Sequence, residues 1–564
     1  MTLMKRLMGV AGATVMTTAA VLGVSAGSAW ACGGLFCDSN NPVNQAAERI
    51  IFGARPDGTV TAVVEIQYQG SADQFSWVLP VPGIPEIGVS STLALDRLQQ
   101  ATNPTYQLIT EVEGECAQQD FATANEADDD DGDFNNANND GGGDVVVLDS
   151  GTVGPFDFEI ISLNPDLDNP ADVAVQWLED NGYDVTAIGP DVLGPYLEDG
   201  MNLVGFRLTN GAGVESIRPI SMTYDTEDPM IPIRPTAVAA NENMGVMVFN
   251  VAPGRAVPSN YRHLILNEAA INWFNPNSNY RDVVNLAADE SGGQGFVTEV
   301  AAPTSDYGET ILFGFEAGSI ADFRGYTGEE SPVDIIYHSY DFSFWDGYAD
   351  AFRLAWSGED DVREVIDCPE CFFIEEEGVI PGFDVATFLT AMDDFVLAPM
   401  DETQDLLGSE AYLTRFFTTM SAFEMTKDPI FKVNAELPDV SNAHTATRTI
   451  LCNPEVAQFE APWRVVFDGV EIYGEGQVWP VETEDLPANR RVEQLDAEGE
   501  PEVVTDNTVQ IRQAISAAGA DAPPPSSLDS GCACATLASQ KPMGGGVAAL
   551  FLLGAVMVWR RRRA

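Results

Sequence analysis

The chain has 564 residues, of which 45% are hydrophobic, and it carries 87 acidic against 27 basic residues for a formal net charge of −60. This length and apolar content suffice for two or three domains with large cores. The charge excludes nucleic acid as an expected partner, because phosphate binding needs a basic surface. An acidic, lysine-poor surface is typical of proteins that stay hydrated at high ionic strength.

Residues 1–31 are typical of a secretory signal peptide. Lys5 and Arg6 precede an apolar stretch, and Ala29-Trp30-Ala31 has the small-residue pattern of a cleavage site. We therefore expect export and a mature start at Cys32. Lipidation of Cys32 is an alternative, but Ala29 stands where a lipoprotein signal favours leucine, so a disulfide to Cys37 fits better.

The other end of the chain, residues 531–564, predicts a membrane anchor. A Cys-Ala-Cys motif and a polar spacer precede an apolar run from Met543 to Trp559, which as a helix reaches roughly 26 Å. An arginine cluster follows and is expected to stay cytoplasmic. This tail resembles the myxobacterial C-terminal sorting signals. The resemblance implies processing by a sorting protease and attachment at the outer surface through the cysteine region, and a plain single-span anchor is the alternative. The sorting and anchor residues are Cys532, Cys534, Arg560, Arg561, Arg562 and Arg563.

Six cysteines remain in the exported body, and an even number in an exported protein favours disulfides. Two local pairs are expected, Cys32 with Cys37 and Cys368 with Cys371. They leave Cys116 to pair with Cys452, although six cysteines allow about fifteen connectivities. The spacing of Cys368-Pro-Glu-Cys371 also occurs in redox sites, but its acidic flanks would raise a thiol pKa, so a structural disulfide is the better interpretation.

The body is expected to be rich in β-structure. A hairpin is predicted where residues 49–55 meet Pro56-Asp57-Gly58, because proline presets φ and glycine accepts a positive φ. Alternating apolar residues indicate a strand over 60–68. A closing hairpin is expected over 464–478. Further strands are predicted at 75–82, 145–148, 153–163, 203–208, 217–224 and 245–251.

Helices are predicted from capping residues and apolar spacing. One covers 93–101, and a second begins at Pro170 after Asn169. A third follows Asp384. A fourth follows Ser409, where apolar residues recur at helical spacing: Tyr412, Leu413, Phe416, Phe417 and Met420.

These elements suggest a β-rich part over 32–240, a mixed α/β part over 241–510 and a Pro-rich stalk over 511–530. The acidic stretch 122–144 cannot bury a core and is expected to be a disordered insertion. A calcium loop is the alternative for this stretch. The EF-hand spacing fails there, because Gly132 at position 6 puts Ala127 at position 1.

Several segments resemble a bacterial family of unknown function, DUF2330. The resemblance implies an exported protein and supplies no catalytic residues. The segments that carry it are Cys32–Cys37, Phe75–Pro82, Val153–Phe156, Trp177–Tyr183, Gly292–Thr298, Tyr412–Arg415 and Glu424–Pro429.

Few residues point to chemistry. Leu148-Asp149-Ser150-Gly151-Thr152 copies an aspartic-protease signature, but the second carboxylate that this mechanism shares is missing, and a turn between two strands explains the motif. The chain has only three histidines, His263, His338 and His444, and no two stand at metal-ligand spacing. We therefore assign no catalytic residue and no metal site.

The most ligand-like segment is the aromatic stretch 337–348. On a strand, Tyr340 would lie on one face and Asp341 with Trp345 on the other, and aromatic rings beside carboxylates suit a sugar ring. A core strand with two apolar faces is the plainer interpretation, and both stay open here.

Together these features predict an exported, β-rich α+β protein with antiparallel sheets and several packed helices, anchored at the outer surface. We expect an envelope role in structure or in binding a surface glycan or protein, with no cofactor. Two alternatives remain: a secreted hydrolase that uses carboxylates, and a calcium-dependent adhesin.

Overall fold

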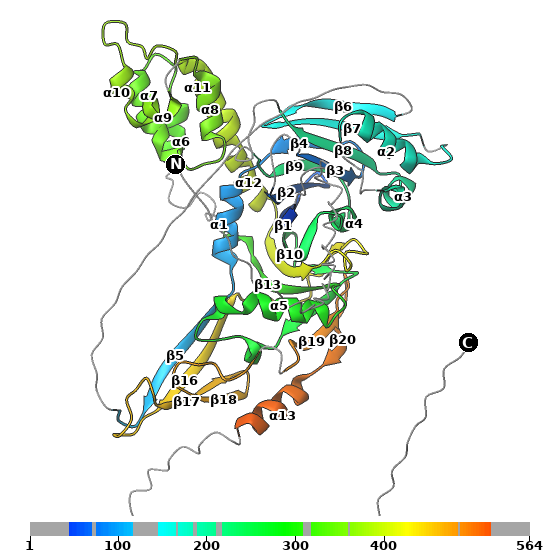
Figure 1. Ribbon diagram of the computed structural model, residues 1–564, viewed down its shortest axis with the longest axis vertical. Coiled ribbons are helices and arrows are strands. Elements are labelled where there is room, and N and C mark those ends of the chain that lie inside the picture. Colours follow the sequence, from blue (N-terminus) through cyan, green and yellow to red (C-terminus); the bar gives the residue numbers. More distant parts are fainter. Residues whose placement is uncertain are drawn as a thin grey trace, which may run out of the picture. The chain divides into compact units, whose positions relative to one another are not determined.

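The computed structural model describes nine stretches of the chain (Figure 1). All nine stretches belong to one compact unit, Met1–Ala522. The chain has a second unit, Pro523–Ala564, which contains none of the described residues. The predicted signal peptide, acidic insertion and membrane anchor also lie outside the described residues. No helix of the described part is long and apolar enough to cross a membrane. The described stretches are 44–69, 75–116, 145–164, 167–183, 189–209, 217–307, 317–358, 361–482 and 486–519.

A ten-stranded sheet takes strands from both parts expected above, so residue 240 does not separate two compact units. The sheet is mixed rather than antiparallel, since β1 pairs with β10 and β12 with β13 in parallel. Long crossovers between these partners allow the parallel pairing. In spatial order the strands are β20 (Glu502–Asp506), β19 (Asn489–Gln494), β12 (Arg262–Leu266), β13 (Gly295–Pro303), β14 (Tyr412–Met420), β10 (Ala240–Ala252), β1 (Asn44–Ala54), β2 (Thr59–Gln69), β9 (Ile220–Asp225) and β4 (Glu86–Val89).

The predicted hairpin at the start of the body is confirmed as β1 and β2. Gly58 takes the expected positive φ of 93°, and the Asp57 carboxylate accepts a hydrogen bond from the Thr59 backbone amide at 3.1 Å. Alternation then gives β1 two buried faces. Ile50 and Phe52 belong to one core cluster, whereas Ile51 belongs to another.

The first of these clusters lies between the large sheet and a four-stranded antiparallel sheet. The second contains residues of the large sheet and of a group of helices. The four strands are β3 (Ser76–Val81), β8 (Asn202–Leu208), β7 (Phe156–Leu163) and β6 (Val145–Val153). The helices are α1 (Thr92–Thr102), α6 (Ala317–Arg324), α7 (Pro332–Ser339), α8 (Tyr348–Ala355), α9 (Val362–Asp367), α10 (Pro369–Phe372), α11 (Val385–Met392) and α12 (Ala398–Leu407).

The turn predicted at Asp149 is wrong. Strand β6 continues through Thr152, and the hairpin turns at Gly154, whose φ is 53°. This strand is the edge of its sheet and has an irregular register next to Asp149. An exposed, irregular edge tolerates polar and glycine residues that would weaken an inner strand.

The fourth predicted helix is also wrong, because its residues form β14. Phe416 and Met420 pack on one face of this strand, and Leu413 packs on the other. A central strand buried on both faces carries apolar residues on both, so its spacing resembles that of a helix. Ser409 follows α12 instead of starting a helix.

Another four-stranded sheet contains the closing hairpin, as predicted (Figure 1). The parallel pairing of β5 and β16 places Glu113 opposite Leu451, and the disulfide Cys116–Cys452 lies just beyond. Helix α13 (Thr508–Gly519) buries Ile511 and Ile515 against this sheet, so these residues belong to the body and not to a stalk. The strands are β18 (Val470–Glu475), β17 (Pro462–Phe467), β16 (Ala443–Leu451) and β5 (Thr105–Glu113).

The remaining elements are shorter or lie beside the sheets. Helix α2 begins at Pro170, as predicted, and α11 begins after Asp384, whose carboxylate accepts a hydrogen bond from the Thr387 backbone amide at 2.7 Å. These elements are α2 (Pro170–Asp180), α3 (Pro190–Glu198), α4 (Ile233–Thr236), α5 (Tyr280–Asp289), β11 (Ala256–Pro258) and β15 (Phe431–Val433).

Candidate functional site

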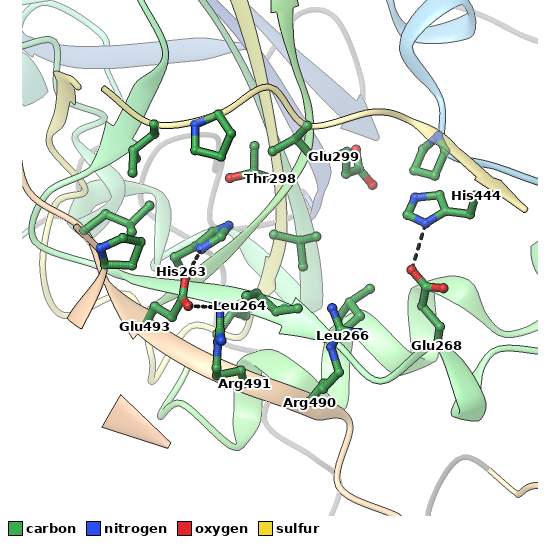
Figure 2. A pocket seen from close by; sticks show the side chains of 18 of the residues that line it. His263, Leu264, Leu266, Glu268, Thr298, Glu299, His444, Arg490, Arg491 and Glu493 are labelled. Atoms are coloured by element: carbon green, nitrogen blue, oxygen red, sulfur yellow. Dashed lines mark hydrogen bonds and ion pairs between the residues drawn. The ribbon is translucent and has the colours of Figure 1, made fainter. Parts of the chain in front are cut away.

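A pocket of about 340 Å³ opens beside strands β12, β13 and β19. It is called the polar pocket because charged side chains stand among its apolar lining residues. The segment Leu437–Val440 forms another wall, held by two backbone hydrogen bonds between Val440 and Ala301 at the end of β13. Residues at the ends of β5 and β16 complete the lining. Two of the three histidines of the chain, His263 and His444, line this pocket (Figure 2).

His263 and Glu493 stand directly opposite each other on the antiparallel strands β12 and β19. The His263 Nδ1 lies 3.1 Å from a carboxylate oxygen of Glu493, and the other oxygen lies 2.5 Å from Arg491. Burial lowers the pKa of His263, with Arg255 and Arg491 adding to the effect, so this imidazole is neutral at neutral pH. Burial opposes ionisation of Glu493, but hydrogen bonds from His263 and the charge of Arg491 bring its pKa below the ordinary value.

His444 and Glu268 form a second pair, on the opposite side of the view in Figure 2. Their nitrogen and oxygen atoms are 2.8 Å apart. The parallel register of β5 and β16 places Tyr106 opposite His444, and the two rings stack with centroids 4.5 Å apart. This stacking holds the imidazole in place and aims it at the carboxylate.

Glu299 is a buried carboxylate with its own partners. Tyr280 on α5 donates a hydrogen bond to it at 2.5 Å, and Arg415 on β14 lies 2.6 Å away. Burial raises the pKa of Glu299 even with these partners present. The group therefore fixes α5 and β14 against β13 and offers little free charge to a ligand.

Arg255 differs from every other charged group in the lining. Its side chain is buried, with the residue 5% exposed. One terminal nitrogen donates to the Pro438 carbonyl at 2.8 Å, while Nε has no partner among the described residues. Within that part of the chain no carboxylate lies within ion-pair distance of Arg255. Burial lowers its pKa, although a guanidinium stays charged at any physiological pH.

The other charged groups of the lining are already paired. Arg490 lies 2.6 Å from Asp468, Arg491 contacts Glu493, and Asp439 accepts a hydrogen bond from Tyr412. Among the described lining residues, Arg255 is thus a buried cation without an ion-pair contact, although the charges of Glu493 and Asp439 act on it from farther away. A guanidinium in this position suits an anionic group. No local sequence pattern indicates this site, because its residues come from segments far apart in the chain.

The structure does not bring the residues of the predicted ligand segment to one face. Residues Pro332–Ala355 are mostly helical rather than a strand. Tyr340 is 56% exposed and Asp341 is exposed, whereas Trp345 is 2% exposed and belongs to the core beneath the helices. The three side chains therefore do not face a common space, because helical geometry replaces the alternation of a strand.

Other sequence-based hypotheses have mixed outcomes. The pairings Cys116–Cys452 and Cys368–Cys371 are both present as disulfides. Asp149 lies on the exposed edge strand β6, away from the polar pocket. The described residues contain no group of three or more histidine, cysteine or acidic side chains that would hold a metal ion. Cys32, Cys37, Cys532, Cys534 and Arg560 to Arg563 lie outside the described residues.

The described residues form a mixed α+β fold with a pocket lined by charged side chains. Residues 26–310 match a family described as uncharacterized protein conserved in bacteria (DUF2330), and the chain belongs to this family. The match includes Arg255, His263 and Glu268 but ends before His444 and Glu493. Searches of curated proteins and of solved structures gave no match.

Proposed function

We propose that this DUF2330 member is an exported, envelope-anchored protein that binds a small ligand bearing a carboxylate in its polar pocket. The observation that carries the proposal is the buried, unpaired guanidinium of Arg255. Holding a cation out of water without a counter-ion in direct contact costs free energy, and a bound carboxylate offsets that cost. A planar guanidinium also matches the geometry of a carboxylate.

The remaining lining suits a ligand with hydroxyl groups. His263, His444 and the carboxylates of Glu268 and Asp439 supply hydrogen-bonding atoms along the pocket walls. A volume of about 340 Å³ lies within the usual range for small-molecule sites and accommodates a monosaccharide. A uronic acid, which combines a ring, hydroxyls and one carboxylate, is the ligand class that we propose, and surface glycans contain such sugars.

The proposed location of the protein depends on sequence features. The signal peptide and the tail with its arginine cluster support export and anchoring, and the two disulfides suit an oxidising compartment. The membrane and a sorting protease are the partners that the tail implies. The excess of acidic residues, 87 against 27 basic ones, argues against nucleic acid as a partner.

Calorimetry with the purified full-length protein tests the ligand class. D-galacturonate should bind, and neutral D-galactose should bind at least ten times more weakly. Arg255→Gln should weaken galacturonate binding by about 10- to 100-fold, since a hydrogen bond to a charged group contributes about 1.5–3 kcal/mol. Equal affinities for the two sugars would refute the proposal.

Arg281→Gln is the matched control. Arg281 is exposed and, like Arg255, donates to a backbone carbonyl, that of Asn243 at 2.9 Å. This variant should bind galacturonate as the wild type does. Incubation with a galacturonate disaccharide, followed by analysis of the sugar, also tests the hydrolase alternative. Release of monosaccharide would show that the protein is a hydrolase and would contradict a role in binding alone.

A further inference from the structure

A second cavity, of about 200 Å³, lies between the large sheet and the sheet of β3 and β8. Strands β1, β2 and β9 form one wall, and β3 with residues near Ile231 forms the other. The lining is mainly apolar, with contributions from Phe52, Ala62, Leu79 and Met222. An apolar cavity of about 150 Å³ in another protein admits benzene, so this one has room for a ring with a short substituent.

Glu48 is the charged side chain that is buried in this lining. The alternation of β1 places Glu48 on the same face as Ile50 and Phe52, toward the cavity. The residue is 4% exposed, and its Oε2 atom has no hydrogen-bond partner among the described residues. Arg49 does not neutralise it, because this neighbour lies on the opposite face of the strand, where it pairs with Glu65 at 2.5 Å.

The other polar groups that line the cavity are Tyr224, Thr226 and Asp228. Asp228 is exposed and lies 3.5 Å from Lys432. None of the described residues that line this cavity is lysine, arginine or histidine. The cavity therefore offers acidic and hydroxyl groups to a ligand, whereas the polar pocket offers a buried cation.

We propose that this cavity binds a small apolar amine, with the ammonium group paired to Glu48 and the apolar part between the two sheets. This site is separate from the polar pocket and does not depend on the function proposed for it. On binding, the Glu48 carboxyl releases its proton to solvent, and the ammonium keeps its own proton. The resulting ion pair satisfies the carboxylate oxygen that lacks a partner in the empty protein.

The electrostatics of the empty cavity agree with this exchange. Burial raises the pKa of Glu48 to about 8, so the carboxyl is neutral at pH 7 when no ligand is bound. Burial also raises the pKa of Tyr224, which keeps that phenol neutral. Binding of an amine at pH 6.5 should therefore release about one proton for each ligand bound.

Calorimetry of the full-length protein in two buffers with different ionisation enthalpies tests both the affinity and the proton release. Benzylamine and benzyl alcohol are the probes, because they have nearly the same shape and differ in charge. Benzylamine should bind at least tenfold more tightly and release about one proton, whereas benzyl alcohol should release none. Glu48→Gln should remove the difference in affinity while leaving benzyl alcohol binding intact. Ala62→Leu, which fills the cavity, should weaken both probes.

Glu242→Gln is the control, because Glu242 also lies on a strand, β10, but is exposed. It should leave both affinities unchanged. Equal binding of the two probes by the wild type, or benzylamine binding without proton release, would overturn the proposal. If Glu48→Gln does not fold, the number of protons released by the wild type and the affinities of Ala62→Leu still test the proposal. None of these results affects the proposal that the polar pocket binds galacturonate.

Discussion

Replacing Glu48 by glutamine should change how the stability of the protein depends on pH. Burial raises the pKa of Glu48 from 4.5 to about 8 in the folded chain. Folding therefore favours the protonated carboxyl. The protonated Glu48 carboxyl contributes its full stabilisation below about pH 4.5, and this stabilisation is lost as pH rises through about 8.

The magnitude follows from the two pKa values. Compared with a side chain that stays neutral, ionisable Glu48 lowers the free energy of unfolding by on the order of 1 kcal/mol at pH 5 and on the order of 4 kcal/mol at pH 8. Glutamine has nearly the same shape and no charge at either pH. The free energy of unfolding of Glu48→Gln minus that of the wild type should thus rise by about 3 kcal/mol from pH 5 to pH 8.

Urea unfolding at pH 5, 6, 7 and 8, followed by tryptophan fluorescence, measures this difference. Other titrating groups act on both proteins and cancel in the comparison. An offset that is the same at every pH reports the loss of a contact, so only the change of the difference with pH tests the argument. Parallel curves across this pH range would refute the reasoning, and Glu242→Gln should give them.

Other substitutions test the fold itself. Replacing Cys116 and Cys452 by alanine should cost about 2–5 kcal/mol of unfolding free energy, because this disulfide closes a loop with a sequence separation of 336; an unchanged urea midpoint would contradict that. Asp384→Ala should cost about 1 kcal/mol, seen as a lower urea midpoint, since it removes the N-cap of α11. Asp149→Asn on the exposed edge strand should change the midpoint by less than about 0.5 kcal/mol, so a large loss would show that Asp149 has a structural role.

Local sequence signals predicted local structure well. The hairpin at Pro56-Asp57-Gly58, the start of α2 at Pro170 and the cap of α11 at Asp384 all follow from backbone preferences of a few residues. Such preferences act over one turn, so the rest of the fold has little influence on them. The pairing of Cys116 with Cys452 followed from counting, since the local pairs left these two.

Tertiary structure determined the conformation of segments whose own sequence is compatible with either a helix or a strand. β14 has apolar residues on both faces because it lies inside the large sheet, and nothing local separates that pattern from a helix. The stretch around Tyr340 became helical and split its aromatic residues between surface and core. In both cases the packing around the segment, rather than its own periodicity, determined its conformation.

Both candidate sites were also decided by tertiary structure. Arg255 is a buried cation in a pocket because Val440 pairs with Ala301 near the end of β13, which holds the segment Leu437–Val440 against the pocket. His263 meets Glu493 because β19 pairs with β12. Glu48 stands out only once a second sheet covers β1. The sequence by itself determined the composition, the predicted export signals, the family and the local turns. Charge burial and cavity shape came from segments far apart in the chain, since a site needs neighbours that only folding brings together.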